Sequence, residues 1–282
     1  MANVQVTVYT DPGCPFGFNA QRQDLQLLWH YGHAIDVNRR MIVLLEKTVT
    51  YEERGLPKSV IADAMARLLD DYGMPMLATP APRMAATIDG CRAYLGAGLN
   101  DPDRASGLLR ALRTQVFSHG NPLDEQQTVH NAAREVGIES ATIDAWLADD
   151  DVAAALAADM AAARAPVPQA LALGHRLSGP AGSQRYSTAS AIYERDGQAV
   201  AAAGFQPFAV HEVAMANVAP DVERRPSPDS VDEVLTWAPY PLATAEIAAI
   251  RDVPIDKART ELEESGASFS RAAGDGYWAA AA

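Results

Sequence analysis

A strand followed by a turn that contains a cysteine is the feature that most constrains this fold. Residues 4–10 are rich in β-branched and aromatic side chains, which predicts a buried strand, and Asp11-Pro12-Gly13 ends it. Cys14 comes next, and a helical pattern begins at about Phe18. The unpaired N–H groups and the positive end of a helix dipole at this position favour a thiolate. In a Cys-x-x-Cys redox site the second cysteine would stand at position 17, but this sequence has Gly17.

The length, composition and charge of the chain predict its cellular compartment and the classes of partner it can bind. The 282 residues suffice for one large domain or two smaller ones. No run of eighteen apolar residues predicts a membrane helix, and residues 1–10 lack the pattern of a signal peptide, so we expect a cytoplasmic protein without membrane contact. Two cysteines suit a reducing compartment. The net charge of −13 disfavours nucleic acid as a partner and favours small molecules or other proteins.

The order of the predicted elements gives an α/β fold with a helical block inside it. A strand at 3–10, a helix at 18–31 and a strand at 35–45 form a β-α-β unit. A long helical stretch follows, with predicted helices at 57–72, 82–98, 102–117, 123–136, 139–148 and 150–164. Strands return at 187–194 and 199–203, on either side of an Asp-Gly turn, and a helix at 208–218 closes the domain.

The last part of the chain reads as a separate, acidic module. Residues 219–230 hold three prolines and many charges, which is typical of a linker. Beyond it we predict helices at 230–237, 242–250 and 254–265 and a small hairpin at the end, which is a winged-helix-like pattern. Residues 227–282 carry ten acidic and four basic side chains, the opposite of what phosphate binding needs. We therefore interpret the tail as a docking module or a site of homo-oligomer formation.

Three stretches carry a resemblance to a known family. They are Tyr9 to Gly17 around the cysteine, Phe117 to Asn121 continued through Glu125–Gly137 and Asp159–Ala163, and Asp196-Gly197 through Gly204-Phe205-Gln206-Pro207. With the element order, they resemble the DsbA-like branch of the thioredoxin-fold superfamily, and the last stretch resembles its FrnE-type members. The resemblance implies a thioredoxin-like domain over 1–218 with a helical insertion at about 50–176. It leaves a linker at 219–230 and a helical tail domain at 231–282.

Two departures from the family pattern affect the expected chemistry. Disulfide-exchanging members have a second cysteine where this chain has Gly17, and they place a cis-proline beside the thiol at the start of the third strand. The matching stretch here is Tyr186 to Ser190, which has no proline, so Ala189 or Thr188 would take that place. The resemblance implies Cys14 as the catalytic residue and a substrate-binding set of Pro15, Phe16, Gly17, Ser187, Thr188 and Ala189. Related isomerases and kappa-class glutathione transferases, which put serine at the first cysteine position, show that this fold also supports non-redox thiol chemistry.

Two functions remain open from the sequence. The first is a thiol-dependent enzyme that uses Cys14 alone, as a monothiol oxidoreductase or as a thiol transferase or isomerase on a small substrate. It would need no cofactor, only a low-molecular-weight thiol as co-substrate. The second is a non-catalytic binding or scaffold protein with a vestigial site, because a buried thiol is inert. A transcription regulator acting through the tail would need a basic face that the tail lacks.

Other candidate residues have ordinary structural explanations beside the functional ones. Cys91 lies in a predicted helix among small apolar residues, where it is either a packing residue or a distant resolving thiol. His119 lies in a small loop that either faces the thiol or is simply surface. Asp11 is either a turn residue or a proton acceptor for the thiol. The six histidines lack the spacing of a metal site.

Overall fold

The computed structural model describes residues 3–281 in two compact units. The first unit runs to Ile42 and resumes at Ala157–Ser227. The second comprises Val43–Leu156 and the chain from Pro228 onward, so the helical block and the tail belong to one unit. The boundary near residue 156 falls inside the helix α8 (Asp150–Ala163). None of the helices in this described part is both long and apolar enough to cross a membrane.

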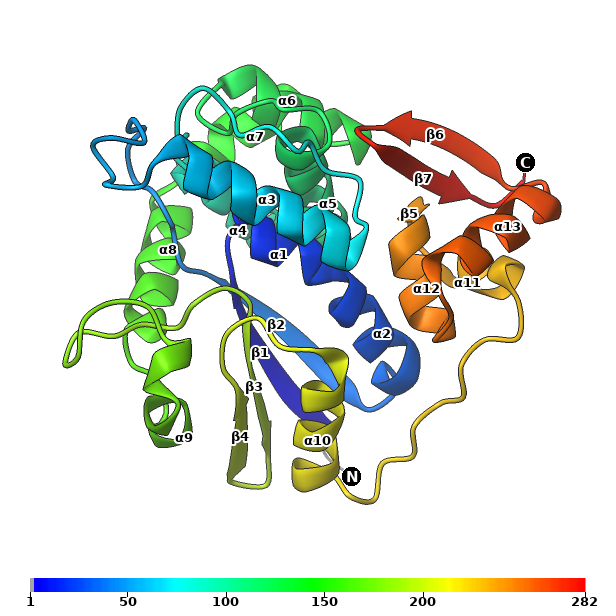
Figure 1. The fold of residues 1–282 in the computed structure, drawn as a ribbon. Coiled ribbons are helices and arrows are strands. Elements are labelled where there is room, and N and C mark those ends of the chain that lie inside the picture. The colour runs from blue at the N-terminus through cyan, green and yellow to red at the C-terminus, as the bar shows by residue number, and fades with distance from the viewer. Residues whose placement is uncertain (1–2, 282) are drawn as a thin grey trace. The chain divides into compact units, whose positions relative to one another are not determined.

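The first unit is built on a four-stranded sheet (Figure 1). Its strands are β1 (Val4–Thr10), β2 (Ile35–Met41), β3 (Ser190–Arg195) and β4 (Gln198–Ala202), in the order β2-β1-β3-β4. β1 pairs in parallel with β2 and antiparallel with β3, and β3 pairs antiparallel with β4. This arrangement is the thioredoxin-like topology that the element order predicted, with β1 in the middle of the sheet beside β3.

Two helices of the first unit, Gln21–Tyr31 and Phe208–Val218, bury one hydrophobic face of this sheet. α1 (Pro15–Asn19) and α2 (Gln21–Tyr31) follow β1, α9 (Pro168–Ala172) precedes β3, and α10 (Phe208–Val218) follows β4. One core cluster joins alternate residues of β1 and β3 to α2 and α10, and it includes Val6, Val8, Leu27, Tyr193 and Met215. In this cluster, side chains from one face of the strands pack against side chains of α2 and α10.

Several predicted boundaries were wrong by a few residues. The first helix begins at Pro15 rather than Phe18, because proline suits the first helical position, and a break at Ala20 separates α1 from α2. The strand predicted for 35–45 ends at Met41, and Val43 has a positive φ of 50°. The strand predicted for 187–194 begins only at Ser190.

The second unit contains the helical block and the tail. The block holds α3 (Lys58–Tyr72), α4 (Ile88–Asn100), α5 (Pro102–Phe117), α6 (Gln126–Glu135) and α7 (Ser140–Leu147). The tail holds α11 (Val231–Trp237), β5 (Leu242–Ala243), α12 (Thr244–Arg251), α13 (Ile255–Ser265), β6 (Ser268–Ala272) and β7 (Asp275–Ala279). Three helices begin two or more residues later than predicted, at Ile88, Gln126 and Thr244, and Leu242 and Ala243 form the short strand β5 instead.

A buried ion pair joins the tail to α5 of the same unit. Two guanidinium nitrogens of Arg110 lie 2.7 Å from the two carboxylate oxygens of Glu246, and Arg110 also donates to the Pro241 carbonyl at 2.7 Å. Nearby, the hydroxyl groups of Ser118 and Tyr277 are 2.8 Å apart. Both charged side chains are buried. The tail is therefore packed on the helical block through specific polar contacts rather than only tethered by its connection.

The proline-rich connection before the tail is hydrogen-bonded to the first unit. The Arg225 carbonyl lies 2.8 Å from Nδ1 of His30, and the Trp29 indole N–H donates to the Pro226 carbonyl at 2.8 Å. The Arg225 guanidinium also lies 3.7 Å from the centre of the Trp29 ring. These contacts hold the part of the predicted linker up to Pro226 against the end of α2.

Candidate thiol site

The turn after β1 places Cys14 at the N-terminus of α1. The Asp11 carboxylate accepts a hydrogen bond from the Gly13 N–H at 2.7 Å, and the Cys14 N–H donates to the Asp11 carbonyl at 3.2 Å. Cys14 is the residue before the first helical position, and its carbonyl accepts the Phe18 N–H at 2.9 Å. Asp11 therefore has the turn role that Asp-Pro-Gly indicated.

Three hydrogen-bonding groups converge on the Cys14 sulfur. Its Sγ lies 2.6 Å from the Thr188 Oγ1 hydroxyl, which comes from the loop before β3. The backbone of Gly17 and of Phe16 also hydrogen-bonds to the sulfur from the first turn of α1. Donors of this kind stabilise the charged form of a thiol. The side chain is nevertheless only 3% exposed.

Burial raises the pKa of the Cys14 thiol above its ordinary value. The hydrogen bonds from Thr188, Gly17 and Phe16 lower the pKa, and the nearby Asp11 charge raises it, but desolvation is the largest cause. The expectation that the helix N-terminus favours a thiolate was therefore wrong for the resting site. α1 has five residues, so its dipole is small, and it acts against the cost of placing a charge in a buried position.

The loop before β3 lies opposite the Cys14 sulfur and forms the other side of the site. Ser187 donates from its hydroxyl to the carbonyl of Arg176, the last residue of a 3₁₀ helix (Gly174–Arg176), at 2.6 Å, which directs its side chain at that helix rather than at the thiol. Thr188 and Ala189 are buried, and the peptide bond between them is cis. Because the Thr188 hydroxyl touches the sulfur, these two groups are in direct contact, with no open space between them.

An aromatic pair lies beside the cysteine turn. Phe16, two residues after Cys14, is 41% exposed, and its ring centre lies 5.7 Å from that of Phe205. Pro15 is half-buried and Gly17 is buried. Of the predicted substrate-binding residues, Phe16 thus presents the largest accessible surface next to the thiol.

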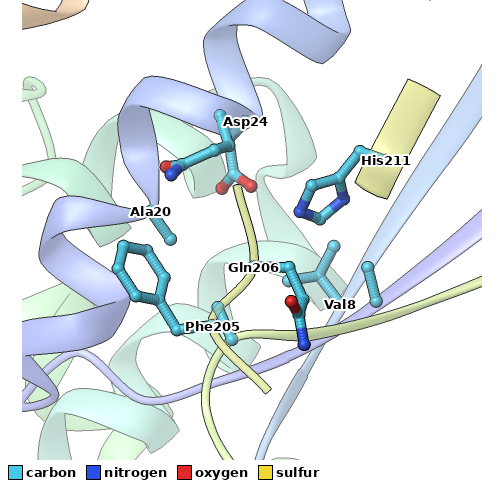
Figure 2. Close-up of a pocket in the computed structure, with 9 residues that line it drawn as sticks. Val8, Ala20, Asp24, Phe205, Gln206 and His211 are labelled. Carbon is cyan, nitrogen blue, oxygen red and sulfur yellow. The ribbon is translucent and has the colours of Figure 1, made fainter. Parts of the chain in front are cut away.

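An unexpected pocket lies among Val8, Asp24, Gln206 and His211 (Figure 2). Its empty volume is about 240 Å³, part of which is open to solvent, and it is lined by Val8, Ala20, Gln23, Asp24, Ala189, Ala191, Phe205, Gln206 and His211. His211 is buried, its Nδ1 lies 2.7 Å from the Tyr193 hydroxyl, and burial lowers its pKa. The lining residues come from β1, the break between α1 and α2, α2, β3, α10 and the loops before β3 and α10, so no spacing in the sequence could reveal the pocket.

Residues 5–166 match the model of the DSBA-like thioredoxin domain. This chain belongs to that family. None of the curated proteins compared with the chain matches it in sequence.

Solved structures of DsbA-like proteins share this fold. A probable DsbA oxidoreductase from Streptomyces coelicolor is 15% identical, with a TM-score of 0.59, and the match covers 80% of this chain and 94% of that one. The cytosolic disulfide reductase DsbM from Pseudomonas aeruginosa is 16% identical, with a TM-score of 0.54 and coverage of 76% and 100%. At these identities the likeness confirms the DsbA-like thioredoxin fold, and the chemistry must be argued from this chain's own residues.

Two other candidate residues, Cys91 and His119, belong to the second unit. Cys91 is fully buried in α4, and neither Cys14 nor Cys91 forms a disulfide. His119 is exposed in the loop after α5. Within residues 3–281, no group of three or more His, Cys, Asp or Glu side chains is arranged to hold a metal ion.

Proposed function

We propose that this DsbA-like protein is a single-thiol enzyme in which Cys14 exchanges with small thiols and disulfides. The observation that carries the proposal is the convergence of the Thr188 hydroxyl and the Gly17 and Phe16 backbone on the sulfur. A cysteine that only fills space in a core needs no such donors. They stabilise negative charge on sulfur, which develops when the thiol reacts.

The proposed exchange has two balanced steps. Cys14 loses its proton to solvent, and the thiolate attacks one sulfur of a small disulfide. The new Cys14–sulfur bond forms as the substrate's S–S bond breaks, and one small thiolate leaves. Because Gly17 stands where a resolving cysteine would be, a second low-molecular-weight thiol attacks the mixed disulfide. It releases Cys14 and forms a new small disulfide, so no cofactor is needed.

The surroundings of the thiol favour a small substrate. Cys14 is nearly covered, so a protein disulfide would have difficulty reaching it, whereas a small disulfide can approach over the exposed ring of Phe16. We assign Phe16 and its neighbour Pro15 to substrate contact, with Gly17 and Thr188 holding the sulfur and with Ser187 and Ala189 shaping the facing loop. A reducing, cytoplasmic setting would supply the second thiol.

The test is formation of a mixed disulfide on the folded protein. Bis(2-hydroxyethyl) disulfide is neutral and small, and one adduct per chain, mapped by mass spectrometry to Cys14, is the expected product. The Cys14→Ser variant should give none, and the fully buried Cys91 serves as the internal control. Adding free 2-mercaptoethanol should remove the adduct. The proposal fails if the folded protein stays unmodified from pH 7 to pH 10.

Burial of Cys14 favours one other candidate function, a non-catalytic binding protein with a vestigial site. That function predicts no adduct in the experiment above and an unchanged binding role in Cys14→Ala. The tail would then carry the function. Its order of three helices and three strands, α11-β5-α12-α13-β6-β7, supports a winged-helix-like module, and its acidic charge favours a protein partner over nucleic acid.

A further inference from the structure

The outer strand of the tail's sheet has an exposed edge. The sheet order is β5-β7-β6, which places β6 at one side, drawn in red in Figure 1. Ser268, Phe269, Ser270 and Arg271 of β6 are all exposed. We propose that β6 pairs antiparallel with β6 of a second copy of this chain, with Ser270 at the centre. This inference goes beyond the proposed thiol chemistry and is independent of it.

The hairpin geometry shows which backbone groups of β6 point outward. Ala272 pairs with Asp275 across a turn of two residues, Ala273 and Gly274. The pair that flanks a two-residue turn exchanges hydrogen bonds, and the bonded pairs then alternate along the strands. Ser270 and Ser268 therefore bond to β7, and the N–H and C=O groups of the residues between them, Phe269 and Arg271, point away from β7.

A twofold axis at Ser270 pairs these outward groups completely. In this register Phe269 lies opposite Arg271 of the second copy, and Arg271 lies opposite its Phe269. Each of these two pairs exchanges an N–H and a C=O, so four hydrogen bonds form and every outward group between the two turns finds a partner. Such an interface is isologous and closes at a dimer, which merges two three-stranded sheets into one.

The side chains are complementary in the same register. Phe269 is 45% exposed, and its ring packs at 4.5 Å on Trp278 of β7. Arg271 points to the same face of the sheet as Phe269, because the two residues are two apart. Each guanidinium thus opposes a phenyl ring of the other copy, an arrangement that favours cation–π contact. A register centred on Arg271 would instead place two like charges opposite each other.

No acidic side chain of β6 would repel β6 of the second copy. The tail is acidic overall, but β6 itself, Ser268 to Ala272, contains no acidic residue. At the end of the hairpin, the Asp275 carboxylate is paired with Arg259 at 2.7 Å. The edge therefore presents hydroxyl groups, one aromatic ring and one positive charge to the second copy.

Disulfide trapping in the full-length chain tests the register. Ser270 would face itself in a pair without hydrogen bonds, where Cα atoms lie about 4.5 Å apart, which suits a disulfide. Under mild oxidation Ser270→Cys should form covalent dimers. Ser268→Cys is the matched control, because Ser268 is also exposed and lies on the same face as Ser270, but in the proposed register it would lie opposite Ala272. At tens of micromolar protein we expect cross-linking of Ser270→Cys to be about tenfold faster than that of the control.

Light scattering during size-exclusion chromatography gives the second measurement. The natural chain should rise from 30.1 kDa toward twice that mass as its concentration increases. Arg271→Pro removes an outward N–H and leaves the β7 ladder intact, so this variant should stay monomeric with unchanged far-ultraviolet circular dichroism. A natural chain that stays monomeric at every concentration overturns the proposal, as does equal cross-linking of the two cysteine variants.

Discussion

Replacing Thr188 by valine tests the electrostatics of the thiol site. Valine matches threonine in shape, so the change removes the hydroxyl 2.6 Å from the Cys14 sulfur with little change in packing. Thr188→Ser is the matched control, since it keeps the hydroxyl. Because that hydrogen bond lowers the pKa of Cys14 against the effect of burial, its loss should raise the pKa further.

The size of the effect follows from two opposing quantities. A hydrogen bond to a charged group contributes about 1.5–3 kcal/mol, and the neutral thiol loses a weaker bond of roughly 1 kcal/mol. The difference of roughly 1.4 kcal/mol corresponds to about one pKa unit, so about tenfold less thiolate below the midpoint. A more basic thiolate is intrinsically about threefold more nucleophilic. The net expectation is a roughly threefold slower reaction at fixed pH, with the midpoint about one unit higher.

The assay is the rate of iodoacetamide alkylation of Cys14 from pH 6 to pH 10.5, followed by mass spectrometry. The natural protein should show a midpoint above the ordinary thiol value of about 8.5, because burial raises the pKa. Thr188→Ser should behave like the natural protein. An unchanged or lower midpoint in Thr188→Val would refute the assignment of the hydroxyl as a stabilising donor.

Three further predictions concern other buried ionisable side chains. Asp11→Asn removes a charge that raises the pKa of Cys14, so the alkylation midpoint should move to lower pH in the same assay. Glu246→Gln leaves the Arg110 charge buried without its partner and should lower the free energy of unfolding by about 3–5 kcal/mol, measured by urea denaturation. Burial lowers the pKa of His211, so its contribution to stability is present above about pH 6.5 and declines as the pH falls below that value. Denaturation midpoints from pH 5 to pH 7.5 should fall less in His211→Gln than in the natural chain.

Local patterns predicted much of the secondary structure. The helices at 102–117 and 208–218 have the same bounds in the structure, because Pro102 begins the first helix and Pro207 directly precedes the second. The turn of Asp196 and Gly197 joins β3 and β4 as expected. The predicted start of the helix at 242–250 was wrong because Leu242 and Ala243 form a strand instead. Their backbone pairs with β7, more distant in the sequence, and a local helical pattern does not reveal this pairing.

The sequence by itself determined the position of Cys14 at a strand-to-helix turn, the loss of a second cysteine at Gly17 and the order of the elements. Only the tertiary structure decided the state of the thiol. Its burial and its contact with Thr188 depend on a loop 174 residues away, and desolvation by that packing outweighs the helix N-terminus. The Arg110–Glu246 pair and the open edge of β6 were decided in the same way. The state of the thiol, the ion pair and the strand edge all depend on which parts of the chain pack together in the folded protein. The spacing of residues along the sequence does not specify that packing.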